Sequence, residues 1–382
     1  MSSTNGNGKK KCYLQWFINS RCDYACRHCT PPDVQPRDLN EKACLEALQS
    51  YADFTAEREA TIAFYPRQAA LTDRFTTVLR AAAELKKKGR LTSMRTVHRG
   101  DLPSDKIRLY QECGVDVCQL TIDAPEAIQD KNRRPGSFRD TLRAFREVQD
   151  AGMQVVVLMI VARFNAPYLP EMLRIVLDQG VDEVVLQVGV DVNANRGPVP
   201  GGTAPEENPW CQGLSANAYR DLLVGVLRFL DTLGPQHADF RRRLILNTPM
   251  FARLFSELGR LEEYEPMRAK TSERPGRAEN GLRLLLQPEG EVRFHQDLPR
   301  LGTFPGASFS KMYANSDTLQ ILDDESRLAN VWAEERPRFT KCHACPVADS
   351  CRPALVGASG SRLFFYPDDH CWVNATGIES AP

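Results

Sequence analysis

Two groups of closely spaced cysteines are the residues of this sequence best suited to chemistry. In the first group, Cys22, Cys26 and Cys29 form the pattern C-x3-C-x2-C within NSRCDYACRHCT. Thiolates are the usual ligands of iron–sulfur clusters, and a four-iron cluster normally takes four of them. Three cysteines on one short loop can therefore hold such a cluster with one iron left open for a further ligand. A structural zinc site and three unrelated buried thiols are the alternatives.

The second group lies near the C-terminus. Cys342, Cys345 and Cys351 form C-x2-C-x5-C within KCHACPVADSCRP, and Cys371 follows twenty residues later. Four cysteines suffice for a closed site, and both zinc and a fully ligated iron–sulfur cluster fit that number. The spacing alone does not choose between these two metals.

The elements that must position the first group alternate along the chain between apolar runs and amphipathic segments. The candidate strands are 12–18, 61–64, 93–97, 116–122, 154–161 and 183–188. The candidate helices are 39–54, 72–88, 104–113, 137–152, 167–180 and 215–233, with Ser137 as the expected cap of the fourth. Such alternation predicts an α/β fold with a parallel sheet, and six units fall short of a closed eight-unit barrel. We therefore expect a partial (β/α)6 TIM-like barrel, with the first cysteine group at the ligand-binding ends of its strands.

The domain organisation follows from changes in composition. We expect a disordered tail at 1–11, the barrel at 12–195, and a loop with a helical connection at 196–281. A strand–turn–strand pattern, LRLLLQPEGEVRF, then opens a small cysteine-rich α+β domain at 282–382.

The overall composition excludes several classes of partner. The 382 residues include 49 Lys and Arg and 49 Asp and Glu, so no net field favours nucleic acid. No apolar run approaches the roughly 20 residues that span a bilayer, and the N-terminus has no signal-peptide core. We therefore expect a cytoplasmic protein, with neither nucleic acid nor membrane as a partner. Disulfides rarely persist in the cytosol, so clustered cysteines indicate metal binding or catalysis.

The first cysteine group, with His28 before its last member, resembles the signature of radical S-adenosylmethionine (SAM) enzymes. The resemblance extends over about residues 12–190, through RGDLPSDKIRLYQECGVDVCQLTIDAP and GSFRDTLRAFREVQDAGMQVVVLMIVARFN to GVDEVVLQ. It implies a 4Fe-4S cluster whose open iron binds SAM. Cleavage of SAM would then give a 5′-deoxyadenosyl radical that abstracts a hydrogen atom from a substrate.

The family's Gly-Gly-Glu-Pro segment, which meets the SAM amino group, is replaced here by FYPRQ at 64–68. Backbone carbonyls around Tyr65 can still accept hydrogen bonds from that amino group, and Gln68 can add a side-chain acceptor.

Four further SAM contacts are carried over from the family by position. Thr121 occupies a place where related enzymes have Ser or Thr near SAM. Arg133 or Arg163 is a candidate partner for the SAM carboxylate, and a solvated surface charge is the alternative for each. Gln187, at the end of the sixth strand, is a candidate for a ribose or adenine contact.

The second cysteine group resembles the C-terminal SPASM region of radical SAM enzymes that modify peptides. The resemblance implies one auxiliary 4Fe-4S cluster, held by Cys342, Cys345, Cys351 and Cys371. The cysteines of a second, inner auxiliary cluster are missing, and His295 stands near where the first would fall. We expect His295 to be an ordinary strand residue, with a remnant metal ligand as the alternative.

These resemblances imply a peptide substrate, oxidised, crosslinked or epimerised during maturation of a ribosomally made natural product. An electron donor of the flavodoxin or ferredoxin type would reduce the cluster. We expect no leader-binding domain before Cys12, so a separate leader-binding protein is a candidate partner. Cys211 is a candidate hydrogen-atom donor to the substrate radical. The alternatives are a dehydrogenase or epimerase of a small molecule, such as a sugar or aminoglycoside, and a non-catalytic iron–sulfur protein.

Overall fold

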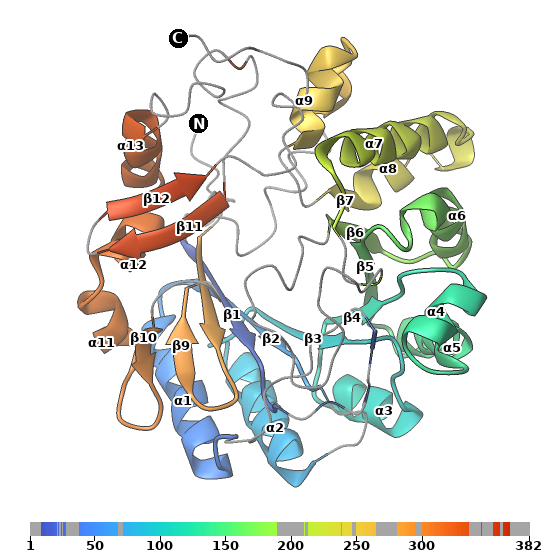
Figure 1. Cartoon of the computed structure of the whole chain (residues 1–382). Helices are drawn as coiled ribbons and strands as arrows, with labels where there is room; N and C mark the ends of the chain where they lie inside the picture. The colour runs from blue at the N-terminus through green and yellow to red at the C-terminus, as the bar shows by residue number, and fades with distance from the viewer. Residues whose placement is uncertain are drawn as a thin grey trace, which may run out of the picture.

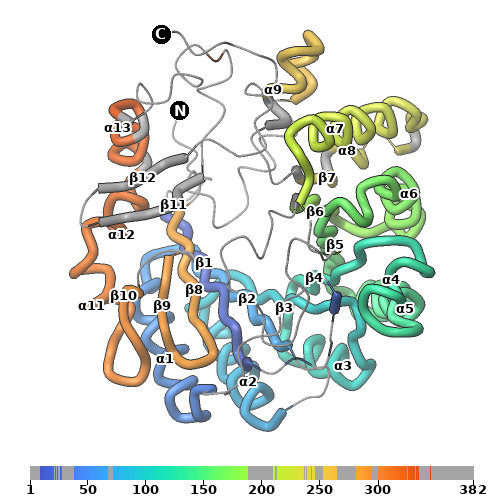
Figure 2. Tube along the Cα trace, viewed as in Figure 1, coloured from blue at the N-terminus to red at the C-terminus, as the bar shows by residue number. Residues whose placement is uncertain are grey.

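A computed structural model gives the structure of the chain. It describes residues 9–20, 22, 24, 26–27, 38–67, 72–188, 210, 213–237, 239–246, 250–264, 281–294, 300–335, 345, 354–359 and 362–366, and Figure 2 draws the others in grey.

A curved sheet forms the centre of the molecule and carries helices on its outer, convex face (Figure 1). Its parallel strands are β1 (Lys11–Trp16), β2 (Glu59–Phe64), β3 (Ser93–His98), β4 (Val117–Thr121), β5 (Gln154–Val161), β6 (Glu183–Val188) and β7 (Leu244–Leu246). All six predicted strands are present, in sequence order. The predicted partial barrel is therefore confirmed.

The helices follow the strands as predicted. They are α1 (Glu41–Phe54), α2 (Asp73–Lys87), α3 (Ser104–Glu112), α4 (Glu126–Asn132), α5 (Ser137–Asp150), α6 (Leu169–Asp178), preceded by the 3₁₀ turn η1 (Ala166–Tyr168), and α7 (Ala216–Asp231). Two elements were not expected. The short helix α4 lies between β4 and α5, and β7 interrupts a stretch that we expected to be helical.

The start of α5 corrects one detail of the prediction. Ser137 is the first residue of the helix, and Gly136 occupies the cap position in the left-handed region, with φ of 78°. The cap is supplied by Asp130 of α4, whose carboxylate accepts hydrogen bonds from the backbone of Gly136 at 2.6 Å and of Phe138 at 2.9 Å. A carboxylate is favourable at a helix N-terminus, and this one joins α4 to α5.

The two faces of the sheet differ in character. On the convex face, Phe64 of β2 packs edge-on against Phe75 of α2, with ring centroids 5.9 Å apart, and Phe75 packs against Tyr110 of α3 in the same way. Each large apolar side chain buried like this contributes roughly 1.5–3 kcal/mol. The alternate residues of each strand point to the concave face, the interior of the partial barrel.

The C-terminal part of the chain extends this sheet. β8 (Leu282–Leu286) pairs in parallel with β1, and β9 (Glu291–Arg293) and β10 (Arg300–Thr303) add antiparallel strands outside it. The predicted hairpin at 282–294 therefore forms, and it shares a sheet with the barrel. Asp323 also ties this part to the barrel, through an ion pair with Arg58 at 2.7 Å.

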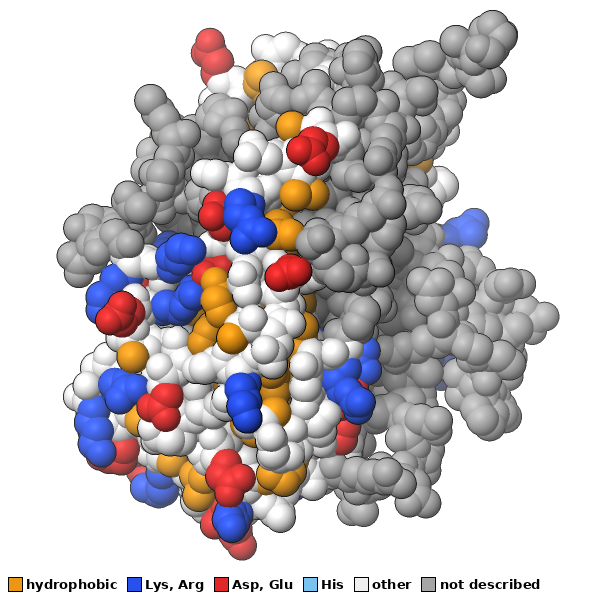
Figure 3. All heavy atoms as spheres, turned by 90° about the vertical axis from the view of Figure 1, so that its left-hand side faces the viewer, with side chains coloured by type: hydrophobic (Ala, Val, Ile, Leu, Met, Phe, Trp, Pro, Cys, Tyr) orange, Lys and Arg blue, Asp and Glu red, His pale blue; other side chains and the backbone are white. Residues whose placement is uncertain are grey.

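The remaining described elements are short. They are η3 (Pro235–His237), α8 (Phe240–Arg243), α9 (Met250–Glu257), α11 (Phe309–Ala314), α12 (Asp317–Leu322), α13 (Glu325–Glu335), and the separate pair β11 (Ala354–Ser359) and β12 (Arg362–Tyr366). On the face seen in Figure 3, basic and acidic side chains are interspersed. Within the described ranges no helix is both long and apolar enough to cross a membrane.

Candidate functional site

The loop that carries the first cysteine group begins directly after β1. Hydrogen bonds and an ion pair hold its two ends, near Ser20 and Asp38. The backbone of Ser20 donates a hydrogen bond to Asp38 at 2.8 Å. Arg74 of α2 pairs with Asp38 at 2.8 Å and donates to the carbonyl oxygens of Ile18 and Leu39. Burial alone would raise the pKa of Asp38, but the hydrogen bonds from Arg74 and Ser20 hold it below its ordinary value.

A cation lies against the sulfur of Cys22. Arg99, the residue after β3, donates a hydrogen bond from Nη1 to Cys22 Sγ, and its guanidinium lies 4.2 Å from the ring centroid of Tyr24. The Tyr24 hydroxyl in turn accepts a hydrogen bond from Arg134 Nε at 2.8 Å. The loop is therefore held by positive side chains from the end of β3 and from the segment after α4.

A buried ion pair holds the backbone of Arg99, the arginine that contacts Cys22. Arg133 and Asp123 pair at 2.6 Å with side chains only 3% and 0% exposed, and Arg133 Nη1 donates to the carbonyl oxygen of Arg99 at 2.9 Å. Burial alone would lower the pKa of Arg133, but the Asp123 carboxylate and the Cys26 thiolate raise it above its ordinary value. Next to this pair, the backbone of Arg27 donates to the carbonyl of Asn132 at 3.0 Å.

This donor set fits an iron–sulfur cluster. A cluster needs deprotonated, negatively charged sulfur ligands, and hydrogen bonds to those sulfurs tune its potential. Arg99 and Arg133 place positive charge at Cys22 and Cys26. Cys29 lies outside the described residues, and the described ones alone bring no three potential metal ligands together.

The segment after β2, predicted to meet the SAM amino group, lies beside the cysteine loop. Tyr65 packs against Phe17 with ring centroids 4.8 Å apart, and its backbone N–H donates to Trp16. The backbone of Arg67 donates to the side chain of Asn19 at 2.9 Å. These contacts join the ends of β1 and β2 at the site. The predicted residue Gln68 lies outside the described residues.

The other predicted SAM contacts differ in their surroundings. Thr121 ends β4, is buried, and donates its hydroxyl to the His98 carbonyl at 2.9 Å. Arg133 has its guanidinium engaged with Asp123 and the Arg99 carbonyl, which gives it a structural role. Arg163, just after β5, and Gln187, near the end of β6, are exposed. Their contacts with SAM stay predictions.

Of the second cysteine group the structure describes Cys345. It is half-buried against the core, and Arg253 of α9 approaches its sulfur with Nη1 at 3.9 Å. Arg253 also pairs with Glu257 of the same helix at 2.9 Å. The predicted residues Cys342, Cys351, Cys371, His295 and Cys211 lie outside the described ranges.

Several residues of the site were not anticipated from the sequence. Arg99 and Asp123 bear on it most directly, and each follows a predicted strand by one or two positions. In a parallel sheet the residues just beyond neighbouring strands meet at one edge. That rule, applied to every charged residue at a strand end, would have selected both.

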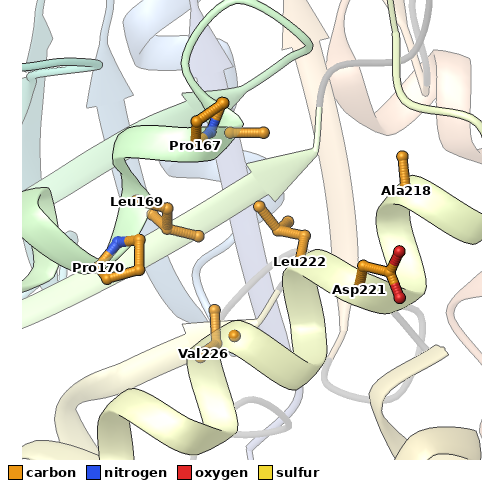
Figure 4. A pocket seen from close by; sticks show the side chains of 9 residues that line it. Pro167, Leu169, Pro170, Ala218, Asp221, Leu222 and Val226 are labelled. Carbon is orange, nitrogen blue, oxygen red and sulfur yellow. The ribbon is translucent and has the colours of Figure 1, made fainter.

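A separate cavity lies outside the barrel, between the start of α6 and α7 (Figure 4). It measures about 250 Å³ and is lined mainly by apolar side chains, with Leu222 and Val226 of α7 facing Pro167 and Leu169. None of the predicted site residues lines it.

Comparison with known proteins gives a family match over the barrel. Residues 16–176 match the model of the radical SAM superfamily. The chain is 25% identical over 194 residues to the pre-heme d1 synthase of Dinoroseobacter shibae, covering 50% of this chain and 47% of that protein. It is 25% identical over 178 residues to the AdoMet-dependent heme synthase of Oleidesulfovibrio alaskensis, covering 46% of this chain and 45% of that one. The match thus spans about half the length of these curated relatives.

A solved structure extends the likeness in fold to nearly the whole chain. Native anSMEcpe with bound AdoMet and the Cp18Cys peptide superposes with a TM-score of 0.61, covering 96% of this chain and 95% of that one. Because the sequence identity is only 14%, this likeness shows a shared fold and nothing more.

Proposed function

We propose, taking residues 16–176 as a radical SAM domain, that this chain cleaves SAM at a cluster held by Cys22, Cys26 and Cys29. It would use the resulting radical to abstract a hydrogen atom from a substrate. The observation that carries the proposal is the contact of Arg99 with Cys22 Sγ at the ligand-binding edge of the parallel sheet.

The chain's own residues prepare this site. When bound, the cluster and SAM would supply an electron and a 5′-deoxyadenosyl radical. Arg99 would offset negative charge on the Cys22 sulfur, while the Arg133–Asp123 pair holds the Arg99 backbone in place. Tyr65 and Phe17, whose rings pack together at the ends of β2 and β1, would place apolar surface beside the site. Thr121, Arg163, Gln187 and the backbone around Tyr65 are the proposed SAM contacts.

We further propose that Cys342, Cys345, Cys351 and Cys371 hold one auxiliary 4Fe-4S cluster in a SPASM-type region. The guanidinium of Arg253 beside Cys345 supports this role, because a cation beside a thiolate stabilises its charge. Such a cluster would pass electrons between the site and a donor of the flavodoxin or ferredoxin type.

A peptide is the proposed substrate, and the likeness of nearly the whole chain to a peptide-bound fold supports it. A separate protein would then deliver the peptide by its leader. The second candidate is a small molecule, and a tetrapyrrole is the class suggested by the names of both curated relatives.

Anaerobic reconstitution tests the proposal directly. The protein is loaded with iron and sulfide, reduced with dithionite and given SAM, and 5′-deoxyadenosine is measured by chromatography. We expect its formation, and its absence from the variant in which Cys22, Cys26 and Cys29 are all replaced by alanine. No 5′-deoxyadenosine from the native chain, with or without candidate peptides and tetrapyrroles, would sink the proposal.

The same assay separates the two substrates. Faster SAM cleavage with a peptide encoded by a short neighbouring reading frame favours the peptide. Faster cleavage with a tetrapyrrole, and none with the peptide, favours the small molecule.

A further inference from the structure

The concave face of the sheet carries two arginines that the site above does not use. On β3, Met94, Thr96 and His98 are buried on the helix-covered face, so Arg95 points to the barrel interior. On β8, Leu282, Leu284 and Leu286 belong to the same helix-covered core, so Arg283 points to the interior as well.

Arg95 has no partner among the residues that the structure describes. It takes part in no hydrogen bond or ion pair with the described residues, and its Nε is shielded from solvent without an acceptor. Arg283 donates to Gln15 Oε1 of β1, but its Nε is likewise shielded and unpaired. An unsatisfied donor away from water is unfavourable, so both Nε groups favour the arrival of an acceptor.

The register of the strands places the two arginines around one region. Arg95 is paired in register with Ala63, Ala63 with Gln15, and Arg283 with the residue two before Gln15. The separation from β8 to β3 is three strand spacings, about 14 Å along the sheet, and the sheet curls around the interior.

No carboxylate stands in the two rows of described residues that contain Arg95 and Arg283. The residues that share these rows on β8, β1, β2, β3 and β4 are Leu285, Tyr13, Gln15, Thr61, Ala63, Ser93 and Val117. All of them are uncharged, and the acidic residue of β2 on the same face, Glu59, lies in the next row, in register with Lys11.

We propose that Arg95 and Arg283, together with Gln15, bind a carboxylate group of the substrate inside the barrel. The guanidinium matches a carboxylate with two parallel hydrogen bonds, and the Gln15 amide can donate a further one. This inference rests on the proposed function for the reaction, and it adds that the substrate is an acid, whether peptide or small molecule.

The position of Arg95 separates this site from the expected place of SAM. Arg99 is the residue after β3 and lies four positions beyond Arg95, which is about 13 Å along an extended chain. Arg99 is at the strand end beside Cys22, where SAM would bind. Arg95 lies deeper in the barrel, where a substrate would enter below SAM.

Protection from an arginine reagent tests the site without needing turnover. The reconstituted full chain is treated with phenylglyoxal alone, with glutarate, or with the neutral glutaramide, and modification of each arginine is followed by mass spectrometry. We expect glutarate to slow modification of Arg95 and Arg283 severalfold, and glutaramide to have no effect. The exposed Arg108 of α3 is the internal control, and its reaction should be the same in all three samples.

Variants then test whether the two arginines share one ligand. In Arg95→Gln, the glutarate concentration that half-protects Arg283 should rise about tenfold or more, because a charge-assisted pair is lost. Arg108→Gln should leave that concentration unchanged. Arg95 makes no hydrogen bond with the described residues, so its replacement should not disturb folding.

Two results would overturn the inference. Equal protection by glutarate and glutaramide, or protection by neither, would show that no carboxylate site exists. Protection of Arg95 by SAM in place of glutarate would assign the pair to SAM. Release of 5′-deoxyadenosine is measured on the same samples, and its absence would count against the proposed reaction without touching the protection result.

Discussion

The two cysteine regions are held by the rest of the molecule in different ways. Around Cys22 the supporting side chains come from the residues just after β3 and α4 and from α2, within the barrel. Around Cys345 a described side chain that approaches the sulfur is Arg253, on the short helix α9 outside the six predicted strand–helix units.

The two arginines also differ in how firmly they are fixed. The carbonyl oxygen of Arg99 accepts a hydrogen bond from Arg133. The charge of Arg133 is itself paired with Asp123 inside the core. Arg253 pairs with Glu257 one helical turn away, and its side chain remains 23% exposed. We infer that Arg99 is held in place more firmly by the described fold than Arg253 is.

The largest effect should come from removing the ligands themselves. Replacing Cys22, Cys26 and Cys29 with alanine should abolish SAM cleavage and leave about four irons per chain, since the other four cysteines remain. Cys345→Ala should lower the iron content as well but leave some SAM cleavage. Iron and sulfide analysis with a 5′-deoxyadenosine assay measures both. Complete loss of iron from the triple variant would contradict two independent clusters.

The next effect concerns the arginines beside the two regions. Arg133→Met should lower the free energy of unfolding by about 3–5 kcal/mol, because it leaves Asp123 charged and unpaired in the core. Arg253→Met should lower it by less than about 1 kcal/mol, because its ion pair is partly exposed. Urea unfolding followed by circular dichroism compares them.

The double variant Arg133→Met with Asp123→Leu is the control for the first. It should recover part of the lost stability, because no unpaired charge remains. Equal losses for Arg133→Met and Arg253→Met would show that the two regions are held equally firmly, against the comparison above.

A backbone change should have a smaller effect on the first region. Gly100, next to Arg99, has φ of 117°, and a Cβ there would lie 2.7 Å from the Thr121 carbonyl oxygen. Gly100→Ala should lower the free energy of unfolding by about 3 kcal/mol, through strain and crowding together. Gly89→Ala is the matched control, with φ of 70° and open space around its Cβ, and should lower it by about 1 kcal/mol. Equal losses would show that crowding beside Arg99 is unimportant.

The strands and most helices could be predicted because their periodicity records burial. The apolar run of β5 and the amphipathic pattern of α5 reflect which side chains face the core, and that information is local in sequence. The helix α4 has seven residues, too few to show a period, and β7 has three. The pairing of β8 with β1 joins segments about 270 residues apart, and no local pattern specifies it.

The site shows the same division. The cysteine spacing predicted Cys22, Cys26 and Cys29 as ligands because all three lie on one loop. The contact of Arg99 with Cys22 joins residues 77 positions apart and depends on β3 lying two strand positions from β1, with β2 between them. Arg133 was one of two arginines predicted, by position in the family, as a partner of the SAM carboxylate, and in the structure it pairs with the buried Asp123. Type and spacing indicate which residues can act, and packing decides which of them are engaged elsewhere.

The smallest effect should be a dependence on pH at the anchor of the first cysteine loop. The folded pKa of Asp38 is lowered, so its pairing with Arg74 adds stability above the unfolded pKa of about 3.9, and this is lost as pH falls through the folded value. Asp38→Asn should therefore be about 1 kcal/mol less stable than the native chain at pH 7, and the difference should shrink below about pH 4. Urea midpoints for both chains from pH 7 to pH 3 measure this. A difference that stays constant over that range would mean that the Asp38 charge does not hold the loop, and that the first region relies on its arginine contacts alone.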